Sequence, residues 1–195
     1  MRRLVLASGN PGKLREMAEL LSPLGVEVLP QGALGIAEAE EPHDSFLENA
    51  LAKARHASRA SGLPALADDS GLCVDALGGA PGVQSAYFAG REGGREERDA
   101  RNNAKLLASL GENRKAHYRC VIALVRNADD PEPLIAEGIW EGEIARAPRG
   151  ANGFGYDPLF LVAERGLTAA ELPEVEKNRI SHRAQAAARL LAALR

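Results

Sequence analysis

The pattern of apolar and polar positions predicts strands that alternate with helices along the chain. An apolar run at residues 3–8 predicts a short buried strand, and the helix behind it repeats apolar residues every three to four positions, with Glu16 among the polar residues off that face. A second strand is expected at residues 26–29. A second helix begins at Ser45, which forms a capping-box pattern with Glu48. Such alternation is typical of α/β proteins with a mixed sheet.

The most distinctive stretch of the chain is Ala65–Gly82. Its apolar strand runs into Asp68 and Asp69, and Ser70 and Gly71 then predict a turn before a second apolar run. A carboxylate pair at the end of a strand can hold a divalent cation and a water against a substrate. Turn chemistry explains the same residue types equally well, because Asp, Ser and Gly all favour turns.

The second half of the chain predicts another helix, a hairpin and a last helix. The helix is expected at residues 96–110, with Ala100, Ala104, Leu107 and Gly111 on one side. The loop before it carries Tyr87 and Phe88, which we expect to be exposed. Two long apolar runs separated by a DDPEP turn predict a β-hairpin. Ser181 caps the last helix.

Composition and charge narrow the class of protein. A length of 195 residues fits one domain, or one domain with a lobe. The 45% hydrophobic and 26% charged fractions predict a globular chain, and the net charge of −3 argues against a general nucleic-acid binder. No apolar run is long enough for a membrane span or a signal peptide. We therefore expect a cytoplasmic protein in which Cys73 and Cys120 are buried free thiols.

The stretch SGNPGK, at residues 8–13, is a candidate phosphate-binding loop. It lies between a strand and a helix, where backbone N–H groups attract anions, and Lys13 adds a positive charge. A simple helix cap is the alternative, with Asn10 as the cap and Pro11 in the first turn. Neither a Walker A loop nor a G-x-G-x-x-G fingerprint is present.

Two further stretches carry candidate binding groups. The glycine-rich segment 150–162 interleaves glycines with aromatic residues, which suits a planar base, although a glycine-rich hairpin loop explains it too. Lys177, His182 and Arg183 gather at the start of the last helix, where the helix dipole disfavours cations. Their position predicts a negative group nearby.

Five blocks occur together and in order: SGNPGK, SFLENALAKA, ADDSGLCVDALGGAPG, GFGYDPLF and EKNRISHR. With them, residues 4–194 resemble the Ham1-like family of non-canonical purine nucleoside triphosphate pyrophosphatases. The resemblance implies hydrolysis of ITP, dITP and XTP to the monophosphate and pyrophosphate, which cleanses the nucleotide pool and prevents misincorporation into DNA and RNA. It also implies a Mg²⁺ requirement, a homodimer, and one domain over residues 1–195, with an elongated mixed β-sheet, flanking helices and two lobes around a central cleft.

The resemblance also implies roles for individual residues. The catalytic proton acceptor and metal ligand matches Asp69, and the second metal-linked acid falls at Glu41, with Glu40 as the alternative. Asn152 stands where the family usually has a glycine, and we expect little effect because Asn tolerates left-handed backbone. The substrate-binding residues match Ser8, Gly9, Asn10, Pro11, Gly12, Lys13, Lys53, Ser70, Phe154, Gly155, Tyr156, Asp157, Lys177, His182 and Arg183.

Elementary chemistry gives these assignments a mechanism. Asp69 either deprotonates the attacking water or chiefly holds a metal-bound water, and the like charge of Asp68 should raise the pKa of one of the pair. Donors from His182, Arg183 or the N–H groups around Gly155 would favour a 6-oxo purine over adenine. The rival hypotheses are a pyrophosphatase for modified pyrimidines and a nucleotide sensor that binds without turnover.

Overall fold

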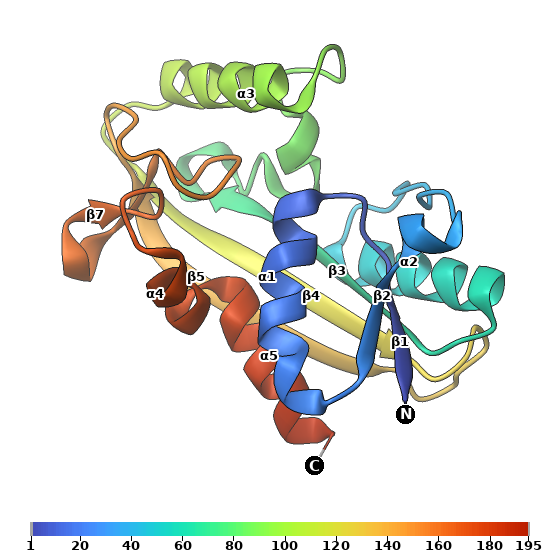
Figure 1. The fold of residues 1–195 in the computed structure, drawn as a ribbon. Helices are drawn as coiled ribbons and strands as arrows, with labels where there is room; N and C mark the ends of the chain where they lie inside the picture. The colour runs from blue at the N-terminus through green and yellow to red at the C-terminus, as the bar shows by residue number, and fades with distance from the viewer. Residues whose placement is uncertain (1, 195) are drawn as a thin grey trace. The chain divides into compact units, whose positions relative to one another are not determined.

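The computed structural model describes residues 2–194, which form one mixed sheet with flanking helices (Figure 1). The strands are β1 (Arg3–Leu6), β2 (Glu27–Pro30), β3 (Ala65–Val74), β4 (Lys115–Val125), β5 (Leu134–Ile144), β6 (Phe160–Val162) and β7 (Leu167–Thr168). The helices are α1 (Pro11–Leu21), α2 (Phe46–Ser61), α3 (Arg95–Ser109), α4 (Glu174–Ile180) and α5 (His182–Ala193). The sheet order is β2-β1-β3-β4-β5-β6-β7, parallel from β2 to β3 and antiparallel from β5 to β7. The predicted mixed α/β class is confirmed.

The chain divides into two compact units. The first unit contains the chain up to Asp69, the segment Cys120–Gly138 and the chain from His182 onward. The second unit contains Ser70–Arg119 and Ile139–Ser181. The expected cleft between two lobes stays a prediction.

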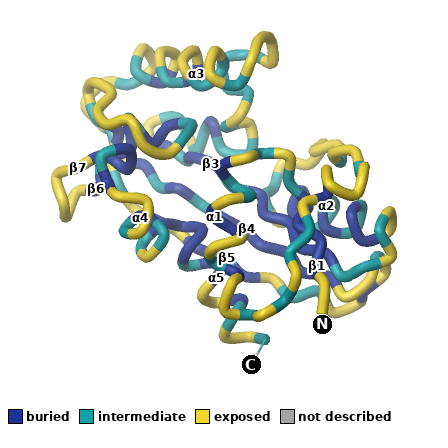
Figure 2. The backbone as a smooth tube through the Cα atoms, in the orientation of Figure 1, coloured by how far each residue is buried: buried dark blue, intermediate teal, exposed yellow. Residues whose placement is uncertain are grey.

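Helices pack on both faces of the strands in the first unit. Because side chains alternate along a strand, Leu4 and Leu6 of β1 join one apolar cluster and Val5 joins another. The first cluster is closed by α1 and α5, and the second by three alanines of α2. Figure 2 shows these strands as the buried centre of the unit. At Gly138 of β5, an added Cβ would lie 2.0 Å from the His182 carbonyl oxygen, so glycine permits the close approach of α5.

The helix starts predicted from local sequence are confirmed. The Asn10 side chain accepts a hydrogen bond from the Lys13 N–H at 3.1 Å, with Pro11 as the first residue of α1. Ser45 Oγ accepts from the Glu48 N–H at 3.2 Å at the start of α2. These signals are reliable because both partners lie within one turn of the chain.

The turn predicted after the aspartate pair is wrong. β3 runs without interruption through Asp68, Asp69, Ser70 and Gly71. Gly71 is needed for space instead, since an added Cβ would lie 2.2 Å from the Gly82 carbonyl oxygen and 2.5 Å from Ser85 Oγ. The pair therefore belongs to a strand, whose side chains point alternately to opposite faces.

The second unit has a core of aromatic residues from three strands. Tyr118, Trp140 and Phe160 pack with ring centroids 4.5–6.4 Å apart. Phe88 packs partly buried against this core rather than being exposed as predicted. On the predicted side of α3, Leu107 packs partly buried against this core, whereas Ala100 and Ala104 are exposed. The buried residues of this helix are Asn102 and Leu106.

Other expectations have mixed outcomes. α4, a short helix before Ser181, was not predicted, and α5 begins directly after that residue. Of the two free thiols, Cys120 is buried and Cys73 is partly exposed. Across residues 2–194, no helix has both the length and the apolar character that crossing a membrane requires.

Candidate active site

The loop between β1 and α1 presents backbone groups at the start of a helix. The Asn10 N–H donates to Ser8 Oγ at 3.2 Å, which tightens the turn around the cap. Gly9 lies directly against Glu38, because an added Cβ would meet its Oε1 atom at 1.7 Å. The candidate phosphate loop joins the carboxyl end of β1 to the start of α1, where backbone N–H groups and the helix dipole favour an anion.

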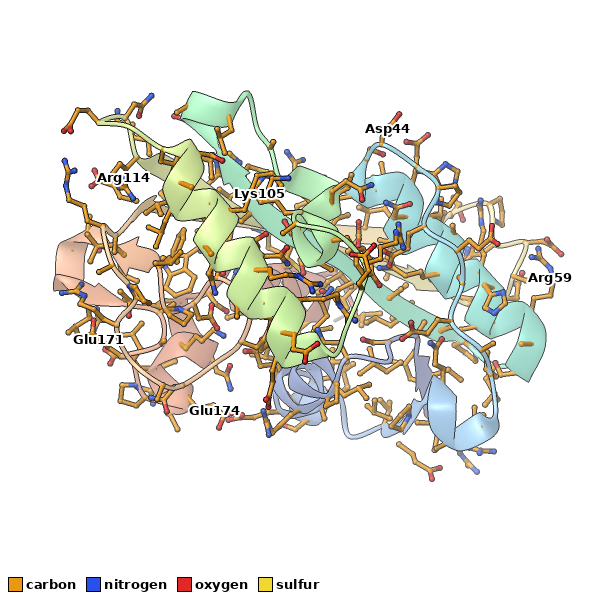
Figure 3. All side chains as sticks on the ribbon, turned by 90° about the horizontal axis from the view of Figure 1, so that it is seen from above. Asp44, Arg59, Lys105, Arg114, Glu171 and Glu174 are labelled. Atoms are coloured by element: carbon orange, nitrogen blue, oxygen red, sulfur yellow. The ribbon has the colours of Figure 1, made fainter. Side chains whose placement is uncertain are left out.

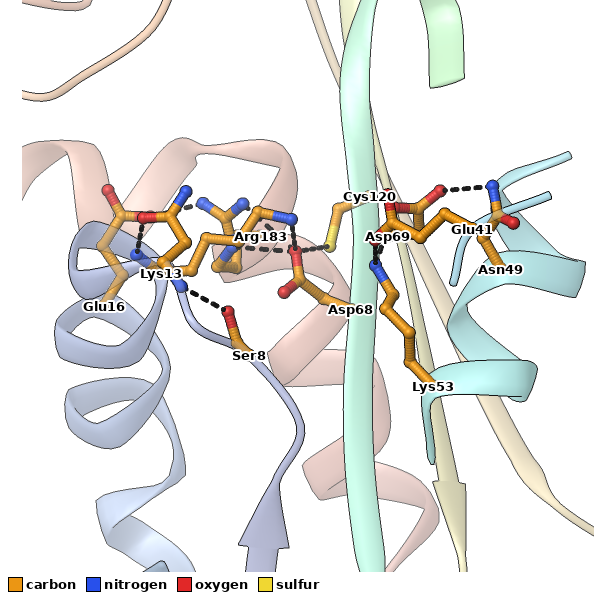
Figure 4. A network of polar contacts seen from close by, with 11 residues as sticks. Ser8, Lys13, Glu16, Glu41, Asn49, Lys53, Asp68, Asp69, Cys120 and Arg183 are labelled. Atoms are coloured by element: carbon orange, nitrogen blue, oxygen red, sulfur yellow. Dashed lines mark hydrogen bonds and ion pairs between the residues drawn. The ribbon is translucent and has the colours of Figure 1, made fainter. Parts of the chain in front are cut away.

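Asp68 lies on the face of β3 that packs against α1 and α5. Its Oδ2 atom is 3.0 Å from Lys13 Nζ and 3.2 Å from an Arg183 guanidinium nitrogen (Figure 4). The same guanidinium also pairs with Glu16. Burial alone would raise the pKa of Asp68, but the charges of Lys13 and Arg183 outweigh it and hold the pKa well below its usual range. Asp68 is therefore held in its ionised form by two cations.

Asp69 points to the opposite face, toward α2. Its carboxylate is 2.9 Å from Lys53 Nζ and 3.4 Å from Asn49 Nδ2 (Figure 4). Burial raises the pKa of Asp69 above its usual value, although Lys53 and Lys13 act to lower it and Glu41 adds to the rise. The expected rise in one member of the pair is thus found, but its main cause is burial rather than the neighbouring aspartate.

Glu41 and Asp69 converge on one cation. Lys53 Nζ lies 2.7 Å from Glu41 Oε1 and 2.9 Å from Asp69 Oδ1. Burial would lower the pKa of Lys53, but these carboxylates raise it, so the ammonium stays charged. Glu40 and Glu41 are both exposed, and Glu41 is the one whose carboxylate joins this group.

The same two carboxylates fit a magnesium ion. Mg²⁺ prefers oxygen ligands and is commonly bound by one or two carboxylates together with substrate phosphates. Within the described part of the chain, no cluster of three or more His, Cys, Asp or Glu side chains could hold a metal. A pair completed by phosphate oxygens is therefore the donor set that these residues can offer, and Glu41 and Asp69 already gather around a positive charge.

The glycine-rich loop of the second unit is held by Asp157. Its Oδ2 atom accepts from the Phe154 N–H at 2.9 Å and from Lys177 Nζ at 2.7 Å. Gly153 has φ +75°, and an added Cβ would lie 2.0 Å from this carboxylate, so only glycine fits. Asn152, which we expected to tolerate a left-handed backbone, does not adopt one. Its side chain donates a hydrogen bond to the Leu172 carbonyl at 3.1 Å.

The side chains of this loop are unequally available to a ligand. Tyr156 is buried, and its hydroxyl donates to the Ser85 carbonyl at 2.8 Å. The Phe154 ring lies 4.9 Å from Lys177 Nζ. The Gly155 N–H, a proposed donor for the base, already donates to Asp99 at 3.1 Å. Of the aromatic residues in the loop, Phe154 is thus the more exposed candidate for a base.

The predicted site residues fall into two groups. In the first unit, Lys13 of α1 and Arg183 pair with Asp68, and Lys53 pairs with Asp69 and Glu41. His182 is buried at the start of α5. In the second unit, Lys177 joins the Phe154–Asp157 loop, and Ser70 follows Asp69 in β3. The negative partners predicted for the basic residues are found for Lys177 and Arg183.

Sequence reasoning missed two residues of this site. Glu16 was placed off the buried face of α1, yet it is buried and pairs with Arg183. Asn49 was read only as part of α2, yet its amide reaches Asp69. The sequence did contain a signal for both residues. Glu16 lies one helical turn from Lys13 and Asn49 one turn from Lys53, and residues three or four apart share a helix face.

A family profile, curated relatives and a solved structure all relate the chain to one family. The profile of the Ham1 family matches residues 4–193. The chain is 64% identical to a dITP/XTP pyrophosphatase of Ralstonia nicotianae, over 100% of this chain and 98% of that protein. It is 66% identical to a dITP/XTP pyrophosphatase of Burkholderia pseudomallei, over 98% and 93%. A solved structure of a HAM1 protein from Coxiella burnetii has a TM-score of 0.90 and 51% identity, covering 100% of this chain and 98% of that one.

Proposed function

Because the chain belongs to the Ham1 family, we propose that it is a dITP/XTP pyrophosphatase that releases pyrophosphate from non-canonical purine nucleoside triphosphates. The observation that carries the proposal is the pair of adjacent aspartates in separate surroundings. Asp68 pairs with two cations, whereas Asp69 shares Lys53 with Glu41. Asp68 is held ionised by these two cations, which hold its pKa low and leave Asp69 as the carboxylate of the pair that can accept a proton.

In this proposal Asp69 accepts the proton of the attacking water. Burial raises the pKa of this carboxyl, which makes the carboxylate a stronger base than an ordinary aspartate. Mg²⁺ bound to the same carboxylate would act in the opposite direction and lower its pKa. Asn49 and Lys53 orient this carboxylate. Asp68 stays ionised and fixes Lys13 and Arg183.

Positive charge manages the triphosphate, which carries about four negative charges at neutral pH. Lys13 and the N–H groups of the β1–α1 loop bind phosphate, and Lys53 holds charge beside Asp69. Glu41 and Asp69 would hold Mg²⁺, which neutralises charge that develops on phosphate oxygens and lowers the pKa of a bound water. The Phe154–Asp157 loop and Lys177 receive the base. A homodimer and a cytoplasmic location remain predictions.

The test is pyrophosphate release from ITP, dITP, XTP, GTP, ATP and dTTP, with Mg²⁺ and with a chelator. We expect metal-dependent pyrophosphate from the first three substrates and little from ATP or dTTP. Orthophosphate release, or tight binding without turnover, would overturn the proposal; the second outcome would instead support a nucleotide sensor. Preference for a modified pyrimidine would support the other rival.

A further inference from the structure

Three polar residues of α3 form a stripe against the glycine-rich loop. Arg95, Asp99 and Asn103 lie four residues apart, so they occupy one side of the helix on successive turns. The guanidinium carbon of Arg95 lies 5.1 Å from the centroid of the Phe154 ring. We call Arg95, Asp99 and Asn103 the α3 stripe. None of them was among the predicted site residues.

The stripe holds both polar groups of Gly155. The Gly155 N–H donates to Asp99 Oδ2 at 3.1 Å, and Asn103 Nδ2 donates to the Gly155 carbonyl at 2.9 Å. Gly155 has φ +63°, the left-handed region, and lies outside every strand, so no sheet pairing satisfies these groups. The conformation of this residue is therefore set by two side chains of α3.

The next residue of the loop is tied to the segment that precedes α3. The Tyr156 hydroxyl donates to the Ser85 carbonyl at 2.8 Å, and Asn102 Nδ2 donates to the same carbonyl at 3.2 Å. Burial, followed by the charge of Asp99, raises the pKa of Tyr156, which keeps its hydroxyl protonated as a donor. Loop and helix thus share one backbone acceptor.

α3 has few apolar anchors of its own. Its buried residues are Asn102 and Leu106, and Figure 2 shows the rest of the helix as largely exposed or half-buried. Lys105, labelled in Figure 3, is exposed and donates to the Phe88 carbonyl. The position of α3 relative to the loop is therefore fixed mainly by directional hydrogen bonds to backbone groups rather than by extensive apolar packing.

We infer that Asp99 and Asn103 are positioning residues that fix the Phe154–Asp157 loop and so determine which nucleobase the site accepts. The inference rests on the proposed function, which assigns this loop to the base. A 6-oxo purine and adenine differ by an acceptor against a donor at one position, so discrimination requires the loop to be fixed closely. Loosening Gly155 should weaken selectivity more than phosphate chemistry, because the aspartates and lysines of that chemistry lie in the first unit.

The experiment measures kcat and KM for ITP and ATP, and equilibrium binding of both nucleotides by calorimetry. Asp99→Ala and Asn103→Ala should each reduce the ITP-to-ATP ratio of kcat/KM about three- to tenfold, as expected for loss of one hydrogen bond. KM for ITP should rise by more than kcat falls. Asp99→Asn keeps an acceptor for the Gly155 N–H and should restore most of the ratio. Glu96→Ala, which removes an exposed carboxylate from the same helix, should leave the ratio unchanged.

The outcomes separate this inference from the proposed function. An unchanged ratio in both alanine variants, with normal thermal unfolding, overturns the inference while the pyrophosphatase activity stands. If the wild-type protein releases no pyrophosphate, but the variants bind ITP and ATP with less selectivity than the wild type, the inference is supported and the proposed activity is not. If an alanine variant does not fold, Asn103→Gln displaces the same donor by one methylene, and an unaltered ratio in that variant also overturns the inference.

Discussion

The two aspartates of β3 are adjacent in sequence but belong to different environments. Asp68 faces Lys13 and Arg183, whereas Asp69 faces Lys53 and Asn49. The alternation of side chains along a strand separates them, so each acquires its own pKa. A turn at this point would have brought them to a shared site, and their roles would not divide in this way.

Asp69→Asn should lower kcat about a hundredfold or more, which is the usual contribution of a positioned general base. The amide keeps the shape of the side chain but accepts no proton, and Lys53 retains Glu41 as a partner. Asp75→Asn, at an exposed aspartate just beyond β3, is the matched control. The measurement is steady-state pyrophosphate release with circular dichroism to verify the fold; a kcat near that of the wild type would contradict the assignment of Asp69.

At the scale of elements, predictions from the sequence succeed where the partners are local. The starts of α1 and α2 follow from Asn10, Pro11 and Ser45, each of which acts within one helical turn. They fail where the decisive neighbour is distant in sequence. Gly71 was assigned to a turn because the approach of Ser85 leaves no local trace, and the α3 stripe was missed because its partners lie more than 50 residues away.

Gly71→Ala should destabilise the protein without changing the residues of the site. The new methyl group would meet the Gly82 carbonyl oxygen, and overpacking of this kind costs about 1–3 kcal/mol. Because that oxygen is backbone, it moves less easily than a side chain. The melting temperature should fall by about 2–12 °C. Gly111→Ala, where an added Cβ meets nothing within 4 Å, serves as the control; equal melting temperatures for the two variants would contradict the packing argument.

At the scale of the whole molecule, the family follows from five blocks spread over the chain, and the seven-stranded sheet agrees with it. The connections among the blocks could not be predicted. Arg183 was one of several candidate donors for the base, and that role stays a prediction. Its guanidinium is buried between Asp68 and Glu16, residues 115 and 167 positions away. Burial of a charge is tolerated only with such partners. No local pattern reveals which ones they are.

Glu16→Gln tests this long-range connection. Removing one partner of a buried ion pair costs about 3–5 kcal/mol, because the other charge stays buried and is less well compensated. Asp68 still holds Arg183, so the lower end of this range is expected. Glu19→Gln, an exposed change on the same helix, should have little effect. Urea unfolding followed by circular dichroism gives both free energies; similar values for the two variants would contradict a stabilising role for Glu16.

The pairing of Arg183 with Glu16 and Asp68 also bears on how the protein is made. A ribosome synthesises Glu16 and Asp68 long before Arg183, which lies in α5. Until that helix leaves the exit tunnel, Glu16 lacks the guanidinium with which it pairs, and Asp68 has Lys13 but not Arg183. The nascent first unit is thus expected to stay open during translation, because α5 supplies Ala186, Ala187 and Leu190 to its first apolar cluster. A product that terminates before α5 would leave this cluster uncovered where that helix closes it.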